Sequence, residues 1–195
     1  MRPDPVEYGW WLSSRAAGVV AFALIACSVL LGLAMANRLV RGIHVVRLHE
    51  HLALAGLVAI AVHAITLLGD RWLNPGAAGL LVPFAMDYRP LYTGLGVIAA
   101  YLALLTGLSF YVRRRIHPRR WRRLHRLTIL VYLLGVVHVV GAGTDAEAAW
   151  LRAVLFATGA PILFLFLLRV LPEQLRPRSL PADSQRGPSM RDALS

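Results

Sequence analysis

The sequence contains no lysine and a single cysteine. Cys27 lies inside an apolar run, so neither a disulfide framework nor a zinc or iron–sulfur site with cysteine ligands is available. All 21 basic residues are arginine, against 10 acidic residues, and the formal net charge is +11. Because this charge lies in short segments between apolar runs, we do not expect a nucleic-acid-binding protein.

Nucleotide-binding motifs and a cleavable leader are also missing. Neither G-x-G-x-x-G nor G-x-x-x-x-G-K-[ST] occurs, and no polar region is large enough for a soluble nucleotide-binding domain. The opening residues, MRPDPVEYGWW, carry two acids and two prolines before the first long apolar stretch. We therefore expect that stretch to stay in the membrane as a span and not to act as a signal peptide.

Long apolar runs dominate what is present. The chain is 57% hydrophobic, and about 20 apolar residues suffice to cross a bilayer. Five stretches reach that length, namely residues 14–36, 48–69, 91–111, 125–143 and 149–171. The sequence therefore predicts an all-α, polytopic transmembrane helix bundle of about five spans. Residues 1–13 would form an N-terminal segment, 14–171 the membrane domain, and 172–195 a disordered cytoplasmic tail.

Arginine is concentrated in alternate connections between these spans. Three arginines follow the first span, eight lie between residues 113 and 126, and four more occur in the tail. Connections rich in basic residues remain in the cytoplasm. We therefore expect the N-terminus outside, the C-terminus in the cytoplasm, and a bacterial inner or plasma membrane as the location.

Four of the seven histidines lie inside or at the mouth of spans, where ionisable groups are rare and indicate function. His49 and His63 belong to the second span, and His125 and His138 to the fourth. These two spans run in the same direction. Separations of 14 and 13 residues correspond to roughly 20 Å along each helix, so two histidine pairs are expected at two matched depths.

Each pair can offer one imidazole nitrogen from either side of a metal, as a six-coordinate haem iron requires. The histidine spacing fits a regular helix in the second span better than in the fourth. At about 100° per residue, His63 lies within roughly 40° of His49, but His138 lies about 140° from His125. The fourth span must therefore be distorted, at Gly135 or a π-bulge, or His125 must sit on a non-helical turn.

The alternative for these four residues is a structural role, as histidines that hydrogen-bond between helices. His51 lies 12 residues before His63 and is open to three roles: a spare ligand, a propionate partner or an interfacial side chain. His44 and His117 lie in basic connections, where solvated surface groups are expected.

Three segments carry a resemblance to a known family: WWLSSRAAGVVAFALIACSVLLGL, LHEHLALAGLVAIAVH, and RRWRRLHRLTILVYLLGVVH followed by GAGTD. Over roughly residues 10–171 the chain resembles the ferric reductase-like transmembrane domain family. That family includes the membrane halves of NADPH oxidases and ferric reductases, and the haem-binding subunit of the bacterial methionine sulfoxide reductase system. Its ligand-bearing helices show H-x13-H and H-x12-H, the spacings found here.

The resemblance implies two haem b groups. His49 and His125 would bind the cytoplasmic haem, and His63 and His138 the outer one. The methionine sulfoxide reductase relative suggests a second reading, with one haem and either FMN, FAD or nothing in the other position. Two departures are the five spans, where the family often has six, and Glu50, which stands where a basic residue is usual.

The expected function is that of an oxidoreductase or electron-transfer subunit. Electrons would come from a separate cytoplasmic flavoprotein reductase or from membrane quinol, and pass to an external acceptor that the residues do not specify. Arg47, Arg123 and Arg126 lie within three residues of a cytoplasmic-haem ligand and are the candidate partners of its propionates. A non-redox transporter or scaffold is the remaining alternative, and it predicts a colourless protein.

Overall fold

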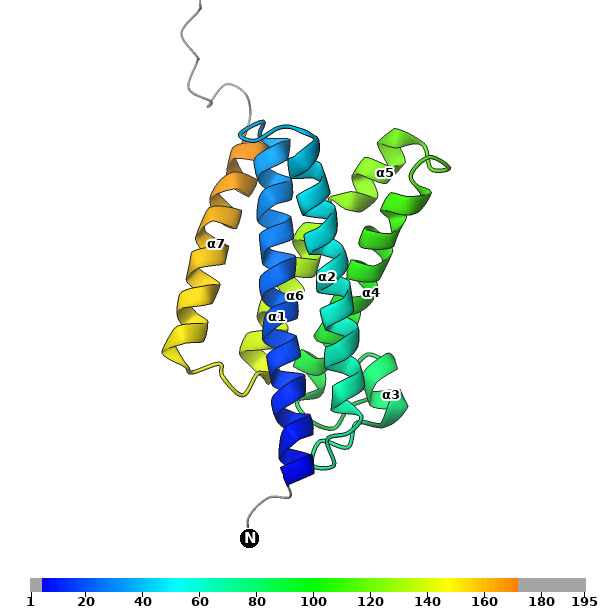
Figure 1. Cartoon of the computed structure of the whole chain (residues 1–195), viewed down its shortest axis with the longest axis vertical. Coiled ribbons are helices and arrows are strands. Elements are labelled where there is room, and N and C mark those ends of the chain that lie inside the picture. The colour runs from blue at the N-terminus through cyan, green and yellow to red at the C-terminus, as the bar shows by residue number, and fades with distance from the viewer. Residues whose placement is uncertain (1–4, 172–195) are drawn as a thin grey trace, which may run out of the picture.

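The computed structural model describes residues 5–171, which form seven α-helices and no strand. The helices are α1 (Pro5–Ala36), α2 (Ile43–Leu67), α3 (Gly76–Leu81), α4 (Pro90–Val112), α5 (Pro118–His125), α6 (Thr128–Ala142) and α7 (Ala149–Val170). Five helical segments are long and apolar enough to span a membrane, and α5 with α6 forms the fourth of them (Figure 1). The predicted all-α bundle of five spans is confirmed.

Several helices begin earlier than the predicted spans, and the difference is largest for the first helix. α1 begins at Pro5, well before residue 14, because a helix can continue beyond the apolar run and proline is favoured in its first turn. The short helix α3, between α2 and α4, was not predicted. The tail expected over 172–195 lies outside the described residues, as do residues 1–4.

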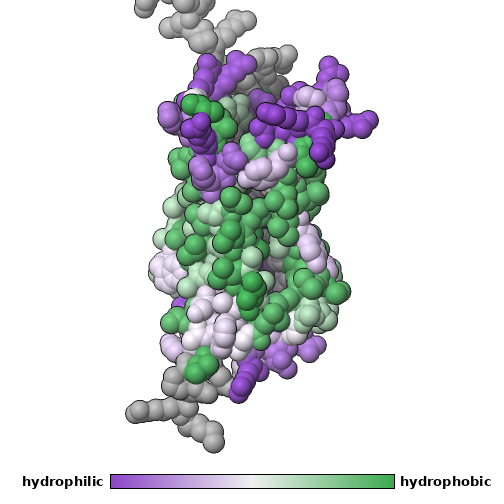
Figure 2. Space-filling model, turned by 45° about the vertical axis from the view of Figure 1, so that its right-hand side comes forward, coloured by the Kyte–Doolittle hydropathy of each residue, from purple (hydrophilic) through white to green (hydrophobic). Residues whose placement is uncertain are grey.

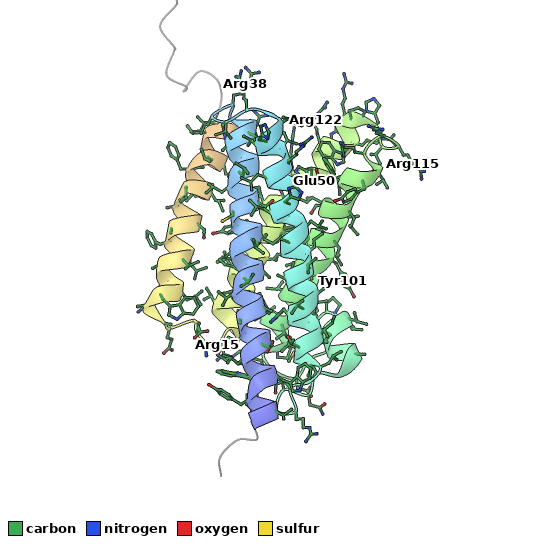
Figure 3. All side chains as sticks on the ribbon, in the orientation of Figure 1. Arg15, Arg38, Glu50, Tyr101, Arg115 and Arg122 are labelled. Carbon is green, nitrogen blue, oxygen red and sulfur yellow. The ribbon has the colours of Figure 1, made fainter. Side chains whose placement is uncertain are left out.

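The surface is divided into bands, as a membrane protein requires. Apolar residues cover the middle of the bundle, and hydrophilic residues gather at its two ends (Figure 2). Arg38, Arg115 and Arg122 lie at one end, which we call the basic end, and Arg15 lies toward the opposite end (Figure 3). Large apolar side chains such as Phe156 and Phe164 are exposed, as expected for a lipid-facing surface.

α1 is the central helix of the packing. It contacts α2 most extensively and also packs against α6 and α7, while α4 packs mainly against α6 (Figure 1). The main buried cluster lies where α1, α6 and α7 meet, and consists of Phe22, Ala26, Val29, Leu33, Tyr132, Ile162 and Leu165. The hydroxyl of Tyr132 lies 3.1 Å from that of Thr158, so this buried phenol has a hydrogen-bond partner. This packing fixes α6 beside α1 and α7.

Candidate cofactor-binding site

Four histidines lie in two pairs inside the bundle. His49 of α2 and His125 of α5 form the basic-end pair, with ring centroids 5.9 Å apart and ring planes at 85°. His63 of α2 and His138 of α6 form the opposite-end pair, with centroids 6.4 Å apart and planes at 73°. The structure thus brings together the residues that the spacing had paired. Along α2 the two pairs are separated by about 21 Å.

The fourth span is interrupted between its two histidines. His125 is the last residue of α5, Arg126 and Leu127 form a turn, and α6 begins at Thr128. The Thr128 hydroxyl donates to the carbonyl of His125 at 2.9 Å, which holds the turn. The distortion expected from the 13-residue spacing is therefore this turn, whereas α6 is regular through Gly135. It allows His125 and His138 to point toward the same helix.

Three of the four imidazoles are anchored to backbone carbonyls through Nδ1. His63 donates to the carbonyl of Ser14 at 2.8 Å, His49 to that of Ser28 at 2.9 Å, and His138 to that of Tyr92 at 2.9 Å. A carbonyl oxygen only accepts, so the proton must be on Nδ1 in each ring. This tautomer leaves Nε2 free to bind a metal, and metal-bound histidines usually donate their other ring N–H in this way.

Glycines lie against the same three rings. A Cβ on Gly18 would lie 3.0 Å from Nδ1 of His63, and one on Gly32 would lie 3.2 Å from Cε1 of His49. A Cβ on Gly96 would lie 2.5 Å from Nδ1 of His138. Any larger residue at these positions would displace the imidazole. The three glycines therefore make room for the rings where the helices approach closely.

Each pair lines its own cavity. The basic-end cavity, about 580 Å³, contains both His49 and His125 in its lining. The opposite-end cavity, about 290 Å³, contains both His63 and His138. Ile25 and Val131 line both cavities and therefore form the wall between them. Most of the other lining residues are apolar, as in cofactor sites generally.

The charged residues at the basic-end cavity are only partly those expected. Arg126 lines it, whereas Arg47 and Arg123 are absent from its lining, although all three are exposed. Arg122 and Arg169 also line it and were missed. Arg169 lies on α7, far from any histidine in sequence, so no spacing pointed to it. Trp121, which stacks on His125 with centroids 5.1 Å apart, was missed as well.

The other histidines lie outside both cavities. His44, His51 and His117 are exposed, and the His117 side chain accepts the backbone N–H of Arg119 at the start of α5. Glu50 is half-buried near the basic end (Figure 3). Within residues 5–171, no group of three or more histidine, cysteine or acidic side chains is placed to hold a bare metal ion.

The geometry of the pairs suits a metal held between two imidazoles. A metal bonded at about 2.0 Å to one nitrogen of each ring would place the ring centroids about 6 Å apart. Both observed separations, 5.9 Å and 6.4 Å, agree with this value. Haem iron takes only two axial ligands from the protein, and each cavity provides apolar space beside its pair. The residues present therefore fit a haem at either position.

A known protein family matches more than half of the sequence. Residues 17–136 match the family described as the ferric reductase like transmembrane component, a range that includes His49, His63 and His125 and ends two residues before His138. No curated protein and no solved structure matched the chain. Because the family match covers more than half of the sequence, the chain belongs to the ferric reductase-like transmembrane family.

Proposed function

We propose that this chain is an electron-transfer subunit that binds two haem b groups and carries electrons from the cytoplasm to an acceptor outside. The observation that carries the proposal is the pair of histidines at each of two depths, each pair lining its own cavity. His49 and His125 would hold one haem, and His63 and His138 the other. When bound, haem b supplies reversible one-electron chemistry at its iron.

The chain's own residues prepare these positions. The carbonyls of Ser14, Ser28 and Tyr92 fix the orientation of three imidazoles and increase the basicity of their Nε2 atoms. The apolar lining excludes water and lowers the local dielectric, and both effects tune a reduction potential. Ile25 and Val131 are shared by the two cavities, so these two aliphatic side chains lie between the proposed haem positions.

The basic end is proposed to face the cytoplasm. Its arginines follow the bias of cytoplasmic connections, and they present a surface suited to an acidic flavoprotein reductase. Membrane quinol is the other proposed donor. Arg126, with Arg122 and Arg169, would pair with the propionates of the basic-end haem, because these guanidinium groups line that cavity.

The test is the visible spectrum of the detergent-purified full chain, oxidised and dithionite-reduced, with a pyridine haemochrome assay. Two haem b groups per chain with sharp reduced α-bands are expected. A colourless protein after haem-replete expression would return the histidines to a structural role and remove the proposal.

One observation favours a second candidate, a single-haem subunit. Nδ1 of His125 is buried and has no hydrogen-bond partner, so the basic-end pair is the weaker of the two. A ratio of one haem per chain, together with bound FMN or FAD, would support this candidate over the two-haem relay.

A further inference from the structure

His125 differs from the other three pocket histidines in how its ring is held. His49, His63 and His138 each donate Nδ1–H to a backbone carbonyl at 2.8–2.9 Å. Nδ1 of His125 is buried without a hydrogen-bond partner, and so is Nε1 of the stacked Trp121. A metal-bound histidine whose other ring nitrogen has no hydrogen-bond acceptor is less well oriented and less basic.

The surroundings of the ring differ in the same direction. Gly18, Gly32 and Gly96 let the other three rings sit tightly between helices, but no described glycine has His125 among its nearest neighbours. His125 instead stacks on Trp121 of its own helix, with ring planes at 18°. The nearest ring partner of His125 is therefore on its own helix, at 5.1 Å against 5.9 Å for His49.

α5 is itself weakly fixed to the bundle. It has only eight residues, its principal neighbour is α4, and the turn at Arg126 and Leu127 separates it from α6. By contrast, His49 lies on the 25-residue helix α2, which packs along α1. A small movement of α5 about this turn would shift His125 relative to His49, which stays on α2.

We infer that His125 is the exchangeable ligand of the basic-end site, so that a small exogenous ligand can replace it while the opposite-end site stays closed. The inference rests on the proposed function, since it requires haem at both pairs. In the exchange, the incoming ligand would take the place of the His125 imidazole, with no change in electron count. Because Arg122, Arg126 and Arg169 line the cavity, the oxidised site should favour small anions such as cyanide.

Carbon monoxide is the first probe, added to the reduced, haem-replete full chain in detergent. One CO per chain is expected for two haems, with half of the α-band intensity altered. His63→Ala and His138→Ala, which remove an opposite-end ligand, should still bind one CO per chain. In the wild-type chain, no CO binding or the binding of two CO would overturn the inference. Loss of CO binding in either variant would overturn it as well.

Haem release from the wild-type chain gives a second readout that needs no ligand variant. Transfer to excess apomyoglobin should be biphasic, with the fast phase about 10- to 100-fold faster than the slow one. Trp121→Leu should accelerate the fast phase alone, because Trp121 stacks on His125 of the basic-end pair. A single phase, or acceleration of both phases, would contradict the assignment.

The results also separate this inference from the proposed function. Two haems that both resist CO and leave at one rate would retain the electron-transfer proposal and remove the exchangeable ligand. A chain that holds no haem would remove both.

Discussion

Arg15 and Asp145 form a two-point ion pair between chain segments that are 130 residues apart. Arg15 lies on α1 and Asp145 follows α6, and the guanidinium also lies 5.0 Å from the centre of the Trp11 ring. The Asp145 side chain is only 12% exposed, and both charged residues line the opposite-end cavity. The pair therefore fastens the loop between α6 and α7 to α1 beside the His63–His138 site.

Removing this ion pair should destabilise the bundle. Arg15→Gln leaves the largely buried Asp145 carboxylate unpaired, and we expect a loss of about 1–3 kcal/mol in unfolding free energy. Thermal unfolding of the detergent-purified protein measures it. The exchange Arg15→Asp with Asp145→Arg should recover part of the loss, whereas Arg38→Gln, an exposed residue at the basic end, should have little effect. Equal effects of Arg15→Gln and Arg38→Gln would contradict this role.

The pocket glycines provide a graded series. Gly96→Ala should be most harmful, because its Cβ would lie 2.5 Å from His138 and would break the bond to Tyr92. Gly18→Ala, at 3.0 Å from His63, should be less severe, and Gly32→Ala, at 3.2 Å from His49, the mildest. The haem content per chain, measured for each variant, gives this order of severity.

Gly9→Ala is the matched control for that series. Nothing lies within 4 Å of its Cβ, and Gly9 is absent from the lining of both cavities, so haem content should be unchanged. Equal haem loss in Gly9→Ala and Gly96→Ala would show that the loss does not come from displacing His138.

Substitution of a histidine that lines a cavity should lower haem content, and substitution of an exposed histidine should not. His63→Ala and His138→Ala are expected to remove the opposite-end haem while the protein stays in the membrane, since one imidazole does not replace two. His51→Ala, on the same helix as His63 but exposed, should keep the full complement. Pyridine haemochrome assays on membrane extracts give the answer, and full haem content in either pocket variant would refute the ligand assignment.

Arg126 should influence the reduction potential of the basic-end haem. Arg126→Gln removes a positive charge from the cavity lining, which disfavours electron uptake, so the midpoint potential should fall. The Coulomb energy suggests a shift on the order of 50 mV. Arg47→Gln, at an exposed residue outside the cavity lining, is the control for spectroelectrochemical titration. Equal shifts in both variants would indicate a general surface-charge effect.

The direction of the bundle is testable with single cysteines. In a Cys27→Ser background, Arg38→Cys marks the basic end and Glu147→Cys the loop between α6 and α7 at the other end. A membrane-impermeant maleimide added to intact cells should label Glu147→Cys and spare Arg38→Cys. The reverse pattern would place the basic end outside.

The spans and the histidine pairs could be predicted because their signals lie in residue type and spacing. Runs of apolar residues fix the crossings, and histidines 14 and 13 residues apart fall at matching depths. The angular mismatch between His125 and His138 even required a distortion in the fourth span. Its place at Arg126 and Leu127 could not be predicted, because neither residue is a helix breaker.

Other parts of the site carry no sequence signal. The acceptors of the Nδ1 protons are backbone carbonyls, which every residue has, so Ser14, Ser28 and Tyr92 could not be singled out. Gly18, Gly32 and Gly96 matter through a close approach between helices, which depends on packing. Arg169 reaches the basic-end cavity from α7, a contact between residues distant in the chain.

One rigid helix, α2, carries a histidine of each pair, while their partners stand on α5 and α6 with a turn between them. The length of α2 between His49 and His63 therefore sets the spacing of the two sites. The turn between α5 and α6 lets the angle between their partner histidines differ from that of a continuous helix. An inserted or deleted residue in α2 between His49 and His63 would put both sites out of register at once. A residue inserted or deleted in the turn would move His125 of the basic-end pair. It would leave the opposite-end pair, His63 and His138, in place, so the two sites can tolerate sequence change to different degrees.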